Sequence, residues 1–304
     1  GLAQLIWLIE ACRRAKALPR LVWPRWTPRV SRLLKFMLPA LLGAGVVQVN
    51  LLIDVILASI LPTGSVSYLY YADRLNQLPL AVIGIAIGTA LLPTMSRNIQ
   101  AGRLQEAKEN QEKSLEIGLI LTIPAAFGLM ILSDSIVIAL FQRGAFDTAS
   151  TSATAIALVC YSAGLPAFVI IKIFQPNFFA RHDTTTPVKI AAGSVVINLI
   201  LNLILMQYFG HAGLAMATSI SAWLSAAIFA IVLKTRNLYS PRRQLLRKII
   251  RITLAATVMG LGLVALKEFS GDFAESSSLS GICVLLLLIF CGGFIYFISL
   301  FLFN

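Results

Sequence analysis

Long runs of apolar residues, separated by short polar stretches, dominate the chain. A membrane-spanning helix needs about 20 mostly apolar residues. Eight runs are candidates for such spans, at residues 36–61, 75–95, 115–132, 156–174, 190–209, 213–233, 249–266 and 279–303. They are far too long for the strands of a membrane barrel, which alternate with a period of two. The pattern therefore predicts an all-α polytopic membrane protein.

Composition and charge agree with this prediction. Apolar residues make up 58% of the chain and charged residues 12%, about half the charge of an average soluble domain. The net charge of +12 could suggest a nucleic-acid partner, but Lys and Arg gather in alternate loops, at residues 13–35, 97–113, 181–189 and 234–251. The positive-inside rule places these loops in the cytoplasm. We therefore expect no nucleic acid, and both ends of the chain in the cytoplasm.

The two ends of the chain differ from its middle. Residues 2–11 look like the end of a preceding span, and a basic, proline-containing segment follows up to residue 35. We therefore expect the chain to be the C-terminal part of a longer protein. The last two spans follow a basic linker and hold almost no polar residues, so they are predicted to form an appended, lipid-facing helix pair.

Asp73 and Arg74 stand at the start of the second span, followed by Gln77. A charge near the bilayer centre costs about 2.5–3.5 kcal/mol on insertion scales and normally faces a partner or a watery cavity. The pair is either an interfacial ion pair beside neighbouring tyrosines or an arginine that binds an anionic substrate group through its forked donors. Lys172, in the fourth span, either reaches the headgroups or lines an inner vestibule.

Polar residues within three other spans suggest a cation site. Asn50 and Asp54 are four residues apart and share a helical face, as do Asn198 and Asn202, and Thr218 on the sixth span could approach the second pair. Oxygen ligands of this kind suit a hard cation such as sodium. The alternative is that Asp54 is a buried, hydrogen-bonded carboxyl group and the asparagines hold helices together, each contributing about 0.6 kcal/mol.

Three segments carry a resemblance to a known family. They are YYADRLNQLPLAVIGIAIGTALLP at residues 70–93, FQRGAFD at 141–147 and PNFFARHDTTTPVKI at 176–190. With the order of the spans, they resemble the MurJ (MviN) family, the lipid II flippases of the MOP transporter superfamily. The resemblance implies two six-helix lobes around a central cavity, and two further helices that form a groove for a lipid tail.

On this resemblance the chain divides into three parts. Residues 1–35 are the end of a preceding span and a basic cytoplasmic loop. Residues 36–235 are the second six-helix lobe of a MOP/MATE-like transporter, and residues 236–304 are a linker and a two-helix lipid-groove hairpin. The first lobe, an implied partner, lies outside the chain.

The resemblance also implies a function in the bacterial inner membrane. Lipid II, the undecaprenyl-linked peptidoglycan precursor, would pass from the inner to the outer leaflet by alternating access, with surrounding membrane lipids as further partners. Arg74 matches a cavity arginine, here expected to bind the pyrophosphate with Asp73, Gln77 and Lys172 nearby. Asp54, Asn198, Asn202 and Thr218 fall where some members bind sodium, although Asn202 replaces a carboxylate. Sodium is the one cofactor considered, and membrane potential is the other expected drive.

Three other functions compete with this reading. A multidrug or polysaccharide exporter of the same superfamily is the runner-up, disfavoured by the last helix pair. A membrane enzyme acting on lipid-linked sugars would need a nucleophile, a base or a metal site, and the chain contains no HExxH, GxSxG or clustered Asp/Glu motif. We therefore expect no enzyme. A passive membrane anchor would not need Arg74.

Overall fold

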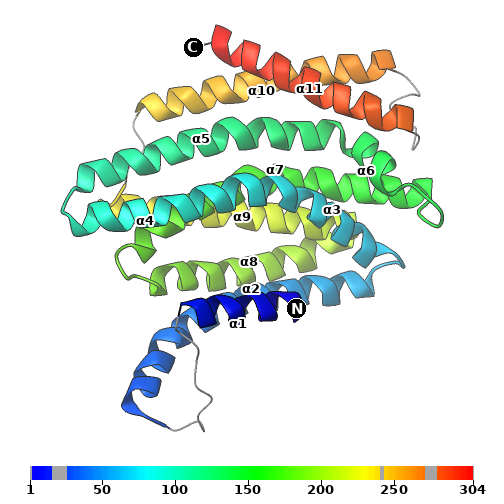
Figure 1. Cartoon of the computed structure of the whole chain (residues 1–304). Helices are drawn as coiled ribbons and strands as arrows, with labels where there is room; N and C mark the ends of the chain where they lie inside the picture. The colour runs from blue at the N-terminus through cyan, green and yellow to red at the C-terminus, as the bar shows by residue number, and fades with distance from the viewer. Residues whose placement is uncertain (1, 16–25, 240–242, 271–278, 304) are drawn as a thin grey trace. The chain divides into compact units, whose positions relative to one another are not determined.

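The computed structural model describes residues 2–15, 26–239, 243–270 and 279–303, which contain helices, turns and no strand. They form two compact units, Gly1–Leu38 and Pro39–Asn304. Figure 1 shows the helices in chain order: α1 Leu2–Arg14, α2 Pro28–Ile60, α3 Ser65–Pro79, the π-helical turn η1 Leu80–Ile85, α4 Ala86–Gln100, α5 Leu104–Ile131, α6 Ser133–Phe141, α7 Thr148–Phe179, α8 Thr185–Phe209, α9 His211–Thr235, α10 Arg243–Ser270 and α11 Leu279–Leu302.

The helices correspond closely to the predicted spans. Seven of those within the described residues are long and apolar enough to cross a membrane, and α2 contributes the shorter apolar helix Gln48–Ile60. α3, η1 and α4 run on as one helical segment of 36 residues, about 54 Å at 1.5 Å per residue. This length exceeds the roughly 30 Å of a hydrocarbon core, so the segment extends well beyond it.

Two helices extend beyond the apolar runs, and side-chain burial explains both. α3 begins at Ser65, before the apolar run that starts at residue 75, because Leu69 and Ala72 are already buried in this earlier part. The charged segment 104–116, which precedes the third apolar run, is the first part of α5. Its Gln111 and Leu115 are buried four residues apart, so one face of this segment packs inside the protein.

α7 lies at the centre of the larger unit and packs against α9, α5 and α3. Small residues permit the closest of these contacts, as is common between membrane helices. A methyl group added to Gly164 would come within 2.6 Å of the Ser219 hydroxyl. That hydroxyl donates to the carbonyl of Cys160 at 2.6 Å, which joins α9 to α7.

α10 and α11 pack against each other and against α5 (Figure 1). Glycines shape their contact, because a methyl group on Gly262 would lie 2.9 Å from Ile295 and one on Gly292 would lie 3.0 Å from Leu263. Lys248 on α10 forms a 2.6 Å ion pair with Glu116 on α5. Helices α10 and α11 are therefore anchored on α5. That residues 236–304 form a separate part of the chain stays a prediction.

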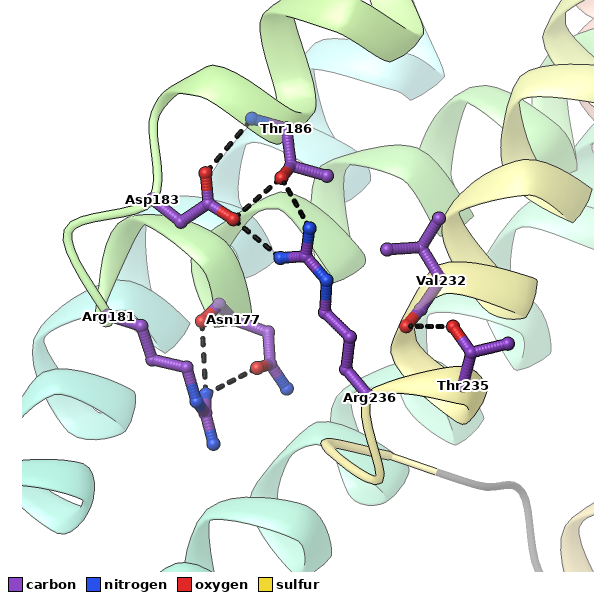
Figure 2. Close-up of polar contacts among 7 residues, drawn as sticks. All are labelled: Asn177, Arg181, Asp183, Thr186, Val232, Thr235 and Arg236. Carbon is purple, nitrogen blue, oxygen red and sulfur yellow. Dashed lines mark hydrogen bonds and ion pairs between the residues drawn. The ribbon is translucent and has the colours of Figure 1, made fainter.

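A polar network joins the start of α8 to the end of α9. Figure 2 shows Asp183, Thr186 and Arg236 turned toward one another. The Asp183 carboxylate accepts from the Thr186 backbone N–H at 3.0 Å and hydroxyl at 2.6 Å, and from Arg236 Nη1 at 2.7 Å. Burial alone would raise the pKa of Asp183, but these hydrogen bonds and the Arg236 charge hold it below its usual value. This network fixes how α8 and α9 meet.

Candidate functional site

The Arg74 guanidinium is held by two neighbours on its own helix, α3. Its Nη1 donates to Gln77 Oε1 at 3.2 Å, and its central carbon lies 4.8 Å from the centre of the Tyr70 ring. Gln77 in turn donates to Asp73 Oδ2 at 2.5 Å, whereas Arg74 Nη2 is 4.0 Å from that oxygen. Gln77 therefore bridges Arg74 and Asp73, whose direct ion pair is long.

The side chain of Arg74 is 54% exposed and that of Asp73 30%. Tyr70, Arg74 and Leu78 follow one another at four-residue spacing, so they form one exposed stripe along α3. The guanidinium has five N–H donors, of which one donates to Gln77, and more than half of the side chain is exposed. Chemically, this stripe offers a fixed, exposed cation that could bind a phosphate oxygen pair.

Lys172 lies elsewhere, on α7 where α7 meets the η1–α4 segment. A methyl group on Gly88 would lie 3.0 Å from the Lys172 carbonyl oxygen, and one on Gly84 would lie 3.7 Å from its Cγ. Its side chain is exposed. The structure shows Lys172 beside the same helical segment as Arg74, but more than two turns further along it.

The predicted cation-site residues do come together, between α2, α8 and α9. Asn202 Nδ2 donates to Asp54 Oδ1 at 2.7 Å, and Asn50 Nδ2 donates to Asp54 Oδ2 at 3.2 Å. Asn198 lies within 3.5 Å of the Thr218 hydroxyl and 3.4 Å of the Ser221 hydroxyl. The sequence did not predict that Ser221 belongs to this cluster. It could have done so, because Ser221 follows Thr218 by three residues and therefore lies on the same face of the helix.

The donor set of this cluster fits a hard cation. Asn202 is fully buried and its side-chain oxygen has no hydrogen-bond partner, which is costly unless something binds it. The Asn198 amide, turned over, would accept from the Thr218 backbone N–H at 3.2 Å and donate to Asp54. Carboxylate, amide and hydroxyl oxygens thus meet in one buried place.

A groove of about 370 Å³ runs between α5, α10 and α11. Its walls are almost wholly apolar and include Pro124 and Gly128 of α5, Leu263 of α10, and Gly293 and Tyr296 of α11. Leu121, Ile289 and Phe297 also line it and are 41–57% exposed, so the groove opens on the apolar surface of the helices. The sequence predicts the helix pair but not the residues that line the groove, because apolar residues carry no chemical signature.

α3 connects the groove with the charged stripe. Pro79, the last residue of α3, is part of the groove wall. Arg74 stands five residues before it, about 7.5 Å along the helix axis. The two residues lie about 140° apart around the helix axis, so a molecule with an anionic head and a long apolar tail would contact both regions by passing partly around α3.

Comparison with known proteins gives consistent matches. The family model described as "Lipid II flippase MurJ" matches residues 1–284. A protein of Rhizobium meliloti (strain 1021) named "Probable lipid II flippase MurJ" is 42% identical over 281 residues, which are 92% of this chain and 52% of that protein. One of Rhizobium tropici with the same name is 38% identical over 99% of this chain and 57% of its own length. The chain spans about half the length of these relatives.

Solved structures show the same fold. A structure described as "Lipid II flippase MurJ, inward closed conformation" matches 94% of this chain and 57% of its own, with a TM-score of 0.76 and 24% identity. A MOP superfamily transporter from Pyrococcus furiosus matches 88% of this chain with a TM-score of 0.58 and 19% identity. The predicted all-α architecture of a MOP/MATE-like transporter is therefore confirmed.

Proposed function

This chain belongs to the MurJ family of lipid II flippases, and from that premise we propose that it forms part of a transporter that moves lipid II across the bacterial inner membrane. One observation carries the proposal. α3 bears an exposed guanidinium at Arg74 and, five residues later, a wall residue of an apolar groove at Pro79. Lipid II is an amphiphile whose diphosphate joins a sugar–peptide head to a long polyprenyl tail, so its two chemically different parts suit these two regions.

The charged stripe would receive the diphosphate. Arg74 is presented by Gln77 and Tyr70 rather than neutralised by Asp73, since the carboxylate lies 4.0 Å away. An anion could therefore take its place beside the guanidinium without breaking a tight ion pair. Asp73 and Gln77 would then contact hydroxyl or amide groups of the head, and Lys172 would meet it at another stage of the transport cycle.

The groove would receive the polyprenyl tail. A tail left in the groove stays in an apolar environment while the polar head crosses, so the cost of exposing it to water never arises. Alternating access would move the head between leaflets, with the first half of the relatives' sequence supplying the facing wall of the cavity. The basic loops would lie in the cytoplasm.

The cluster around Asp54 would hold sodium. Asp54, Asn198, Asn202 and Thr218 would be its ligands, and the ion would supply a positive charge that compensates the Asp54 carboxylate within the membrane. Sodium entry or the membrane potential would then drive the cycle. The unpartnered oxygen of Asn202 supports this assignment.

An exporter of drugs or polysaccharides is the second candidate, because MATE-type transporters share the fold. The groove between α5, α10 and α11 favours a lipid substrate instead, since a soluble substrate has no tail to place there. The family's named activity is transport, which also argues against a membrane enzyme and a passive anchor.

Arg74 provides the test. The complete gene product, with Arg74→Ala or Arg74→Lys, would be expressed in bacteria whose own lipid II flippase can be depleted. Arg74→Ala should abolish growth and leave lipid II in the inner leaflet, and Arg74→Lys should rescue poorly because an ammonium lacks the forked donors. Arg103→Lys, an exposed arginine in the α4–α5 loop, is the matched control. Normal flipping by Arg74→Ala would refute the proposed headgroup site.

A further inference from the structure

Tyr296 makes the polar contact that joins α11 to α5 inside the groove. Its side chain is almost fully buried, at 1% exposed. Its hydroxyl donates a 2.7 Å hydrogen bond to the backbone carbonyl of Ile120, 176 positions away in the sequence. Both residues line the groove. A mostly apolar wall thus contains a buried polar pair.

The Ile120 carbonyl is free to accept this bond because of Pro124. In an α-helix each carbonyl accepts from the N–H four residues later, and the residue four positions after Ile120 is Pro124, which has no N–H. α5 nevertheless continues as a helix to Ile131. The proline therefore leaves a vacant acceptor in the middle of α5, facing the groove.

Without a donor, this carbonyl would be a polar atom in the wall of an apolar site. A buried carbonyl that lacks a hydrogen bond is unfavourable, and it would be a poor neighbour for a hydrocarbon chain. Tyr296 removes this problem, because its hydroxyl donates to the carbonyl while the residue forms part of the groove wall.

Helix α10, which packs beside α11, forms an ion pair near each of its ends. Lys248 of α10 pairs with Glu116 of α5 at 2.6 Å, and Lys267 of α10 lies 3.9 Å from Asp134 of α6. Both pairs fix α10, and neither involves α11. The Tyr296–Ile120 bond, in contrast, links α11 directly to α5, so it constrains how far the two helices stand apart at this point.

We propose that Tyr296 is a positioning residue for the polyprenyl chain, which sets the separation of the α5 and α11 walls and keeps the groove apolar by occupying the carbonyl that Pro124 leaves free. This inference rests on the proposed function, because it takes the groove to be the tail site. The residue acts through the shape and polarity of the groove and needs no reaction of its own.

Three variants of the complete gene product separate positioning from simple hydrogen-bond satisfaction. Tyr296→Phe removes the hydroxyl and keeps the ring. Pro124→Ala gives Ile120 a helical N–H donor, and a carbonyl can still accept a second bond from Tyr296. The double variant has a satisfied carbonyl but no link between α11 and α5. Tyr208→Phe, which removes an exposed hydroxyl on α8, is the matched control.

The measurement is binding of undecaprenyl phosphate to each purified protein in lipid nanodiscs, with melting temperature recorded in parallel. Tyr296→Phe should weaken binding about three- to tenfold, the scale of one hydrogen bond. In the double variant the melting temperature should recover while the weakened binding remains. Pro124→Ala alone gives the reference value for the double variant, and Tyr208→Phe, which lies outside the groove, should bind like the unchanged protein.

Two results would overturn the inference. Unchanged binding by Tyr296→Phe would show that the hydroxyl does not position the chain. Recovery of binding in the double variant would show that the hydroxyl only satisfies the carbonyl. If the unchanged protein itself binds no undecaprenyl phosphate, the proposed tail site fails, which is a different outcome from a failure of Tyr296 alone.

Discussion

Asn202 of α8 donates a hydrogen bond to Asp54 of α2 at 2.7 Å, across 148 positions of sequence. The bond uses the amide nitrogen of Asn202 and leaves its buried oxygen without a partner. The Asn202 amide thus stabilises the Asp54 carboxylate by a hydrogen bond but does not neutralise its charge. An oxygen-rich, buried cluster with one formal negative charge would bind a cation weakly, and a single substitution could strengthen that binding.

Asn202→Asp should increase the affinity of the complete protein for sodium about tenfold. Two adjacent carboxylates repel each other, and a bound cation relieves that repulsion. The melting temperature should therefore rise more steeply with NaCl than with KCl, because a ligand that binds only the folded state stabilises it. Asp54→Asn should abolish the sodium response.

Asn237→Asp is the matched control for this experiment. Asn237 is exposed in the turn after α9, with a positive φ of 56° that aspartate also tolerates. The same charge change there should leave the sodium response as it was. An identical response in Asn202→Asp and the unchanged protein would argue that the cluster joins helices and binds no ion.

Filling the groove should block the tail site without disturbing the fold. Gly128 and Gly293 line the groove, and a methyl group on either would meet nothing within 4 Å. Gly128→Leu and Gly293→Leu should each lower undecaprenyl phosphate binding about tenfold or more, because the new side chain takes the volume of the chain.

Gly193 offers a close control, since its added methyl group also meets nothing within 4 Å and it lies on α8, away from the groove. Gly193→Leu makes the same change in helix propensity. It should bind undecaprenyl phosphate normally. Normal binding by both groove variants would place the tail elsewhere.

The Asp183–Arg236 contact predicts a pH-dependent contribution to stability. The pKa of Asp183 is lower in the folded protein than its usual value of about 3.9. The folded protein therefore binds this proton less tightly than the unfolded chain. The resulting stabilisation is present in full above about pH 4–5 and is lost as pH falls through the folded pKa.

Asp183→Asn should lower the free energy of unfolding at pH 7 by about 1 kcal/mol or less, as is usual for a partly exposed ion pair. The difference in unfolding free energy between Asp183→Asn and the unchanged protein should decrease between pH 5 and pH 3, where Asp183 becomes protonated. Thermal melts of the purified protein across this range would measure it. In an Arg236→Gln background, the effect of Asp183→Asn on the free energy of unfolding should be smaller. An effect of Asp183→Asn that does not change with pH would contradict the proposed contribution of the Asp183 carboxylate.

The helices and the local polar pairs could be predicted from sequence because both depend on short-range geometry. Residues four apart on a helix face the same way, which is why Asn50 lies beside Asp54 and Asn198 beside Asn202. That Thr218 would approach Asn198 followed from a short α8–α9 turn. The binding roles of these residues, and of Arg74, stay predictions.

The contacts between distant helices could not be predicted in the same way. Pro124 shows in the sequence that the Ile120 carbonyl lacks its helical donor. Nothing in the sequence says which of the many distant hydroxyl groups supplies the replacement, and Tyr296 is among the last residues of the chain. The polar, tyrosine-rich first part of α3 depends on a distant helix in a similar way, since it is buried against α7.

The groove opens between half-exposed side chains such as Leu121, Ile289 and Phe297, so in a membrane its entrance would face acyl chains. An inhibitor designed for it would first have to dissolve in the bilayer. Its potency would then follow its concentration in the lipid phase, and the same aqueous dose would give different occupancies at different lipid-to-protein ratios. Medicinal chemistry on this target would have to optimise partitioning together with fit.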